Sequence, residues 1–351
     1  MQVSRDMMRE TTKDFTVYYN PKLHGEIRLD TNTNVLGSNP AATKYLAEHT
    51  WDLNMYPNTY SDNLRTALAE LYGLEQSNFI AGNGSDELLD ITFKTFTNWK
   101  DNSVVPVPSY TLYDYFVKLN GGRAIEVDLT DDYQLDVDEM VKQDAKIAIM
   151  PSPNNPTGNC FKTKDIEEIL SRFNGIVVVD EAYTEYADES FIRRVDEFDN
   201  LVVLRTFSKA YAMAALRVGY AATNKKLAEM MMCIKIPYSL NAVSEGAAIA
   251  AVKDQEFVRK SVQTVKEQRP KLDAGMRKLG FETYPSDSNF ILARSPIDHR
   301  VLVDGLKERG ILIRDFGAKR RTENCVRPTV GTEELNNLLL SKMAEVIESC
   351  R

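Results

Sequence analysis

The chain has 351 residues, more than a single hydrophobic core usually holds, so a large domain with a smaller one is expected. An apolar fraction of 43%, with charges of both signs interspersed, is typical of a globular protein and excludes an intrinsically disordered chain. The formal net charge of -8 argues against nucleic acid or an anionic membrane surface as a partner, because both would repel the protein.

The sequence contains no signal for export or membrane insertion. The first ten residues are polar and charged, and no apolar run is long enough to span a bilayer. The cysteines and histidines are too widely spaced to predict a metal site, and reduced thiols are the ordinary state in the cytoplasm. We therefore expect a cytoplasmic protein with no metal and no membrane partner.

Short apolar runs alternate with helical patterns between about residues 78 and 223. Short apolar runs rich in β-branched residues predict strands that are buried on both faces. The runs occupy residues 78–81, 103–107, 124–127, 146–150, 175–179, 201–204 and 218–221. Because helices separate them, we expect an α/β fold with a three-layer αβα large domain around a mainly parallel seven-stranded sheet.

The sequence changes character after Tyr238. Residues 241–279 are rich in Ala, Glu, Lys and Gln with helical periodicity, which predicts one or two long helices. Further strands and a helix are predicted at residues 289–292, 311–314 and 333–350. We therefore expect a large cofactor-binding domain at residues 30–245 and a smaller α+β domain made of residues 1–29 and 246–351.

Residues 82–87 (Gly-Asn-Gly-Ser-Asp-Glu) follow the first of these strands and precede an amphipathic helix. Ligands of open parallel sheets bind beyond the carboxyl ends of the strands. The glycines would let the backbone approach an anion, and the first N–H groups of the helix have no partner within it. The segment is also ordinary chemistry for a helix start, with Ser85 or Asp86 as the cap, so by itself it is weak evidence for a phosphate site.

Polar side chains also follow three later strands of the predicted sheet. These residues are Asn154 and Asn155, then Asp180 and Tyr183, and finally Thr206, Ser208, Lys209 and Arg217. Each residue alone is compatible with a turn, a helix cap or a solvated surface group. Together they offer an amine for a Schiff base, a carboxylate for a pyridinium nitrogen and a cradle for phosphate, which are the groups that pyridoxal phosphate requires.

Three motifs carry a resemblance to a known family. They are Asn-Asn-Pro-Thr-Gly at 154–158, Val-Asp-Glu-Ala-Tyr at 179–183, and Thr-Phe-Ser-Lys-Ala at 206–210 followed by Arg217. Each lies at the end of a predicted strand. From Leu29 to Gly331 the chain resembles the fold-type-I pyridoxal-phosphate aminotransferases, and among them it is most similar to the histidinol-phosphate aminotransferases.

The resemblance implies a role for each matching residue. Lys209 would form the internal aldimine and move the proton at the substrate's Cα, and Asp180 would pair with the pyridine N–H. Tyr183 and Asn155 would hydrogen-bond the phenolic oxygen, and Tyr110 would stack on the ring. The phosphate would be held by Ser85, Asp86, Thr206, Ser208 and Arg217.

The resemblance also implies a substrate site and a partner. Arg327 and Arg314 match arginines that bind the substrate's anionic groups, and Asn32 is expected beside them. Tyr56 matches a tyrosine that reaches the phosphate of the neighbouring subunit, which implies a homodimer with shared active sites. Tyr18 or Tyr19 is a further candidate to cover the pocket.

Departures from the family pattern fall near the expected substrate entrance. The family usually has Asn-Glu-Asn-Pro where this chain has Asn-Thr-Asn-Val at 32–35, and Pro328 replaces a β-branched residue. The segment Lys-Arg-Arg at 319–321 is unusually basic. None of these departures involves an expected cofactor residue, so they bear on the amino donor and not on the cofactor.

The implied function is transamination of L-histidinol phosphate with 2-oxoglutarate, which gives imidazole-acetol phosphate and glutamate in histidine biosynthesis. An aromatic amino-acid aminotransferase, or less so a threonine-phosphate decarboxylase, would share the same cofactor residues, and both remain open. A nicotinamide-dependent dehydrogenase would need Gly-x-Gly-x-x-Gly, and residues 82–87 lack its third glycine. A binding protein on this fold would be expected to lack Lys209 or Asp180.

Overall fold

The computed structural model describes residues 5–17 and 27–350 of the chain. Tyr18 and Tyr19, the candidates for covering the pocket, lie outside the described residues. Among the residues described, no helix has both the length and the apolar character that a membrane crossing requires. The cytoplasmic location stays a prediction.

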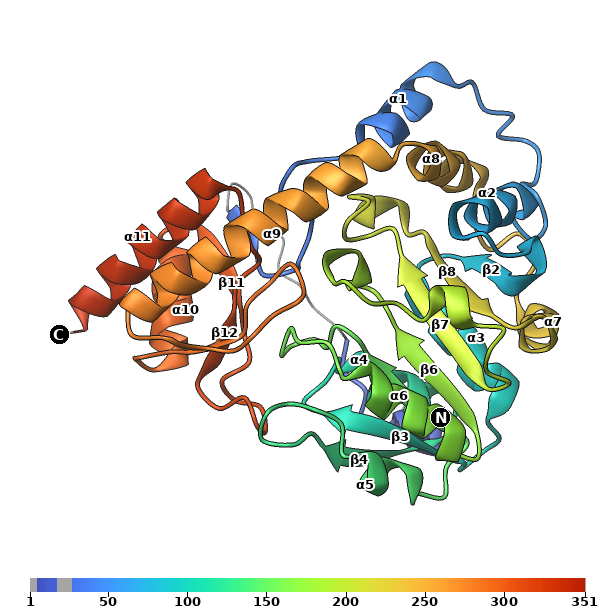
Figure 1. Cartoon of the computed structure of the whole chain (residues 1–351), viewed down its shortest axis with the longest axis horizontal. Helices are drawn as coiled ribbons and strands as arrows, with labels where there is room; N and C mark the ends of the chain where they lie inside the picture. The colour runs from blue at the N-terminus through green and yellow to red at the C-terminus, as the bar shows by residue number, and fades with distance from the viewer. Residues whose placement is uncertain (1–4, 18–26, 351) are drawn as a thin grey trace.

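The larger sheet has seven strands in the order β2-β8-β7-β6-β5-β3-β4 (Figure 1). Their bounds are β2 (Phe79–Gly82), β3 (Asn102–Val107), β4 (Arg123–Asp128), β5 (Ile147–Pro151), β6 (Ile176–Asp180), β7 (Leu201–Thr206) and β8 (Gly219–Thr223). Only β8 pairs antiparallel, with β2 on one side and β7 on the other. The prediction of a mainly parallel seven-stranded sheet is confirmed.

Alternate side chains of the central strands enter two separate cores, one on each face of the sheet. In β6, Val178 packs into one core while Val177 and Val179 pack into the other. Continuous apolar strands are stable here because helices cover both faces. The helices are α1 (Pro40–Glu48), α2 (Asp62–Tyr72), α3 (Ser85–Phe96), α4 (Leu112–Leu119), α5 (Val137–Val141), α6 (Thr163–Arg172), α7 (Lys225–Ile234) and α8 (Ala242–Lys253). Buried residues of α3, α4 and α7 fill the core that contains Val178, which confirms the three-layer arrangement.

A second sheet, in the order β1-β11-β12-β10-β9, lies beside the first (Figure 1). Its strands are β1 (Ile27–Leu29), β9 (Glu282–Thr283), β10 (Ala293–Arg294), β11 (Ile311–Asp315) and β12 (Cys325–Arg327), and its helices are α9 (Gln255–Lys278), α10 (His299–Glu308) and α11 (Glu333–Ser349). The predicted smaller α+β part is therefore present, and α9 leads into it from α8. The domain boundaries at residues 29/30 and 245/246 stay predictions.

One predicted strand has a different form. Residues 289–292 are buried, but they make an isolated bridge between Phe290 and Thr329 in place of a regular strand. The amide of Ile291 still donates to the carbonyl of Pro328. Pro328 has no N–H to return, so a regular ladder cannot continue through this position.

Candidate active site

Apart from Tyr56, the predicted cofactor residues meet in a cavity of about 280 Å³ at the carboxyl ends of the central strands. Ten of the residues expected from the sequence line it, namely Ser85, Asp86, Tyr110, Asn155, Asp180, Tyr183, Thr206, Ser208, Lys209 and Arg217. An adjoining cavity of about 180 Å³ shares Lys209, Tyr183, Tyr110 and Asn155 with it. That second cavity is also lined by the three expected substrate residues, Asn32, Arg314 and Arg327.

Asp180 ends β6 with its carboxylate held by a donor on each oxygen. The hydroxyl of Tyr113 donates to Oδ2 over 2.8 Å, and the backbone N–H of Ala182 donates to Oδ1 over 3.1 Å. Burial raises the pKa of Asp180 to about 6, and these two hydrogen bonds act in the opposite direction. The carboxylate is therefore fixed in one orientation at the wall of the cavity.

Tyr113 is a site residue that the sequence argument missed. It is fully buried on α4, and its ring packs edge-on against Tyr110 with centroids 5.4 Å apart. A tyrosine on a helix is usually a core residue, so its local sequence does not mark it as part of a site.

Lys209 lies where the two cavities join. Its Nζ donates to the carbonyl of Thr31 over 3.0 Å and lies 5.5 Å from the ring centroid of Tyr183. The Tyr183 hydroxyl accepts a hydrogen bond of 3.0 Å from the side-chain amide of Asn32. The amine, the phenol and the amide are thus within one small volume, open to both cavities.

The start of α3 and Arg217 form one end of the first cavity. Gly84 precedes the helix with φ 85°, and no side chain caps the first turn. Arg217 Nη2 contacts the Asp86 carboxylate at 3.0 Å, and its Nη1 contacts the Ser208 hydroxyl at 3.4 Å. The backbone N–H groups of Ser85 and Asp86 belong to the first turn of α3 and have no partner within the helix, so they are available to an anion.

Glycine is required behind this turn. A Cβ on Gly219 would lie 2.3 Å from the backbone nitrogen of Ser85, and a Cβ on Gly84 would lie 2.7 Å from Nη2 of Arg217. The close packing of β8 against the turn therefore sets the position of the helix start.

Arg327 is buried at the back of the second cavity. Its Nη1 donates to Oδ1 of Asn155 and its Nη2 to the carbonyl of Asp30 over 2.9 Å. Its Nε is buried with no hydrogen-bond partner among the residues that the structure describes. Burial lowers the pKa of Arg327 to about 10, and neighbouring Arg314 also lowers it. An anionic ligand would satisfy the free N–H and compensate this charge.

Arg314 and Arg327 face each other across the small sheet, since they are directly paired residues of β11 and β12. Within the described parts of the chain, no carboxylate lies within 4.0 Å of the Arg314 guanidinium. The antiparallel register thus brings together two cations that are distant from each other in sequence.

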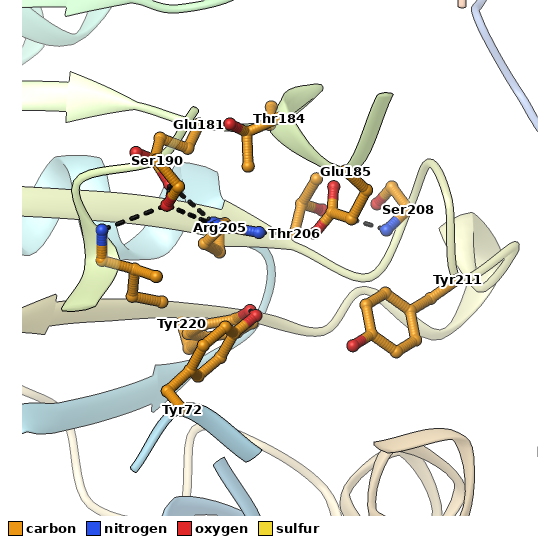
Figure 2. Close-up of polar contacts among 12 residues, drawn as sticks. Tyr72, Glu181, Thr184, Glu185, Ser190, Arg205, Thr206, Ser208, Tyr211 and Tyr220 are labelled. Atoms are coloured by element: carbon orange, nitrogen blue, oxygen red, sulfur yellow. Dashed lines mark hydrogen bonds and ion pairs between the residues drawn. The ribbon is translucent and has the colours of Figure 1, made fainter. Parts of the chain in front are cut away.

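A buried ionic cluster supports the strand ends behind the cavity (Figure 2). Arg205 on β7 binds Glu181 and Glu185 at 2.8 Å each, and Ser190 donates to Glu181 over 2.7 Å. Burial alone would lower the pKa of Arg205, but Tyr72, Glu181 and Glu185 together raise it well above its usual range. Glu181 directly follows Asp180, and Arg205 directly precedes Thr206, so the cluster joins two strands that carry site residues.

Tyr56 lies in neither cavity of its own chain. It is 82% exposed and packs against Tyr238, with ring centroids 4.9 Å apart and the ring planes tilted by 30°. Of the described residues that were expected at the site, Tyr56 alone lines neither cavity.

The sequence profile of the aminotransferase class I and II family matches residues 24–343. The chain belongs to this family. A histidinol-phosphate aminotransferase of Thermoanaerobacter sp. (strain X514) is 34% identical, covering 97% of this chain and 99% of the relative. One of Cytophaga hutchinsonii is 39% identical, covering 90% of this chain and 89% of the relative. The structure of histidinol-phosphate aminotransferase from Sinorhizobium meliloti in complex with pyridoxal-5'-phosphate has a TM-score of 0.90 at 23% identity and covers 98% of each chain. The class I and II aminotransferase fold therefore extends over almost the whole molecule.

Proposed function

We propose that this aminotransferase transfers the amino group of L-histidinol phosphate to 2-oxoglutarate, with pyridoxal phosphate attached to Lys209. The observation that carries the proposal is Arg327, a buried guanidinium that lines the same cavity as Lys209 and has an Nε without a hydrogen-bond partner among the described residues. A planar fork of this kind favours a carboxylate or phosphate bound through two hydrogen bonds. The donor is supported by the two curated relatives, which are named for it.

The first cavity fits pyridoxal phosphate. The start of α3, Thr206, Ser208 and Arg217 would hold its phosphate, and Asp180 would hold the proton of its ring nitrogen. Tyr110 would stack on the ring, and Tyr183 with Asn155 would donate to the ring oxygen. When bound, the cofactor supplies an electron sink for the charge that develops as the substrate loses its Cα proton.

Lys209 is the base that we propose for this proton. Lys209 borders both cavities, so its Nζ can reach a substrate held by Arg327 and a cofactor held at the α3 start. The carbonyl of Thr31 would orient the free amine once the substrate has taken its place on the cofactor.

The donor and the acceptor would use the same pair of arginines in turn. Histidinol phosphate has a phosphate and no carboxylate, whereas 2-oxoglutarate has two carboxylates. Arg314 and Arg327 together suit either anion, because each guanidinium can bind two oxygens. The products would be imidazole-acetol phosphate and glutamate.

The active species that we propose is a homodimer with shared sites. Leu53, Met55, Tyr56 and Ile236 are exposed apolar residues, and the backbone hydrogen bond from Tyr238 to Thr59 joins their two segments. A contiguous apolar surface of this kind is uncommon on a monomer and favours a protein partner. A second copy would cover it and would bring Tyr56 to the other subunit's cofactor phosphate.

A panel of amino donors tests the proposed substrate. The panel contains histidinol phosphate, phenylalanine, tyrosine, histidine and threonine phosphate, and kcat/KM is measured with 2-oxoglutarate as acceptor. We expect histidinol phosphate to give the highest value and Lys209→Ala to abolish turnover with every donor. A higher value with phenylalanine or tyrosine would make the protein an aromatic amino-acid aminotransferase, and release of carbon dioxide from threonine phosphate would make it a decarboxylase.

A further inference from the structure

The basic segment 319–321 lies in the loop between β11 and β12, and its three side chains have different surroundings. Arg320 is paired with Asp128, at the end of β4, and lies 3.8 Å from Glu126. Arg321 lies 3.4 Å from the carboxylate of Asp131. These two arginines therefore hold the loop against the edge strand of the large sheet.

A further contact holds the loop from the large sheet's side. The hydroxyl of Tyr133 donates to the carbonyl of Arg321 over 2.7 Å, and Arg321 Nη2 donates to the carbonyl of Thr130 over 3.1 Å. At the other end of the loop, Asp315 accepts from the N–H of Gly317 and contacts His299, each over 2.8 Å. Both ends of the loop are thus anchored.

Lys319 differs from its two neighbours because no acidic residue that the structure describes pairs with it. Among the described residues, no carboxylate lies within 4.0 Å of its Nζ, which instead lies 5.9 Å from the ring centroid of Phe316. The guanidinium of Arg327 lies 5.2 Å from the centroid of the same ring. Lys319 lines the same cavity as Arg314 and Arg327, and part of its surface remains exposed to solvent, which places it at the mouth of the cavity.

The charges of this cavity are not balanced. Partial burial lowers the pKa of Lys319, and the charge of Arg314 lowers it further. Arg314 acts on Arg327 in the same direction. The nearest acidic group of the lining, Asp30, has its carboxylate bound by Arg28 at 2.7 Å. A bound anion with more than one charge would relieve this repulsion.

We propose that Lys319 is the third cation of the substrate site and that it selects a phosphate dianion over a carboxylate. This inference rests on the proposed function, because it names how that same site recognises its donor. Arg327 binds the anion from the buried end of the cavity, and Arg314 binds it from the paired strand β11. Lys319 adds a third positive charge at the mouth of the cavity, which a phosphate dianion can use and a single carboxylate does not need. Arg320 and Arg321 serve as positioning residues, since their contacts with the β4 edge keep Lys319 over the cavity.

The test compares Lys319→Gln with the wild-type holoenzyme on histidinol phosphate and on histidinol, the same amine without the phosphate. We expect kcat/KM for histidinol phosphate to fall about tenfold, as for the loss of one charge-assisted hydrogen bond at a partly exposed position. The value for histidinol should change less than about twofold. Lys319→Arg should restore most of the loss, and Lys278→Gln, which removes an exposed lysine at the end of α9, should have no effect.

A binding measurement separates this inference from the identity of the donor. Methyl phosphate and acetate are titrated into the wild-type and Lys319→Gln holoenzymes by calorimetry. Loss of affinity for methyl phosphate alone supports the inference whichever donor the panel selects. Equal losses for histidinol phosphate and histidinol, or unchanged affinity for methyl phosphate, would overturn it while leaving the proposed transamination intact. A wild-type enzyme that prefers phenylalanine would instead overturn the proposed donor.

Discussion

The carboxylate of Asp180 shows how single hydrogen bonds set the charge of the site. Burial favours its protonated form, and the hydroxyl of Tyr113 favours its charged form. With a pKa of about 6, Asp180 is mostly ionised at neutral pH and loses its charge as the pH falls below that value. A partner for a pyridinium nitrogen has to be ionised, so Tyr113 maintains the state that the proposed mechanism needs.

We therefore predict that Tyr113→Phe raises the pKa of Asp180 further. The affinity for pyridoxal phosphate should fall at low pH, and we call this fall the acidic limb of the pH profile. Its midpoint should move to higher pH by about one unit, which corresponds to the loss of one hydrogen bond to a charged group. The shift is upward because the ionised form of Asp180 loses the hydrogen bond from Tyr113. The protonated form of Asp180 therefore persists to higher pH. The measurement is the dissociation constant of pyridoxal phosphate, titrated by fluorescence across the mildly acidic and neutral range.

Tyr186→Phe is the matched control for this prediction. Tyr186 is also fully buried, and its hydroxyl lies beside Ser261 of α9; within the described residues it makes no hydrogen bond with Asp180. This variant should leave the midpoint of the acidic limb unchanged, even if it lowers stability. An equal midpoint in the two variants would show that Tyr113 acts only by packing.

At the scale of elements, the end of β6 and the end of β7 each bring a cavity residue next to a residue of the buried ionic cluster. Asp180 and Thr206 line the cavity, while Glu181 and Arg205, next to them in sequence, belong to the cluster of Figure 2. Tyr72 and Tyr220 close this cluster through a hydroxyl contact of 2.6 Å. Because its side chains are buried, the cluster ties the two strand ends together with little screening by water.

We predict that Arg205→Met destabilises the protein strongly. The substitution leaves the buried carboxylates of Glu181 and Glu185 without their counter-charge, which typically costs about 3–5 kcal/mol. Urea unfolding followed by circular dichroism measures the change. The control is Arg172→Met, whose partners Asp138 and Glu168 are exposed and which should leave the free energy of unfolding nearly unchanged, because water screens exposed ion pairs. Similar losses in the two variants would contradict a stabilising role for the cluster.

At the scale of the whole molecule, the apolar surface around Tyr56 predicts that activity requires two chains. Inactive Lys209→Ala chains and Tyr56→Ala chains should regain activity on mixing, because one of the two sites in a mixed dimer would contain both residues intact. Activity is followed over time after mixing, with each variant alone as the control. Sedimentation that shows a fully active monomer would exclude the shared site.

Much of the large sheet and of the cofactor cavity was determined by the sequence alone. The predicted runs at 146–150, 175–179 and 201–204 became β5, β6 and β7 with small shifts at their ends. Fully buried strands carry continuous apolar residues, and the polar residues that follow them can only lie at the edge of the sheet. Local patterns were therefore sufficient to bring Asp180 and Lys209 together.

The tertiary structure alone decided the contacts between distant segments. Tyr113 and Asp180 are 67 residues apart, and nothing near Tyr113 in sequence indicates that its hydroxyl meets a carboxylate. The basic segment 319–321 has a uniform composition, yet only the packing of its loop against β4 separates Lys319 at the cavity from the two paired arginines. A side chain's partner depends on which surfaces meet when the chain folds, and neither periodicity nor local composition contains that information.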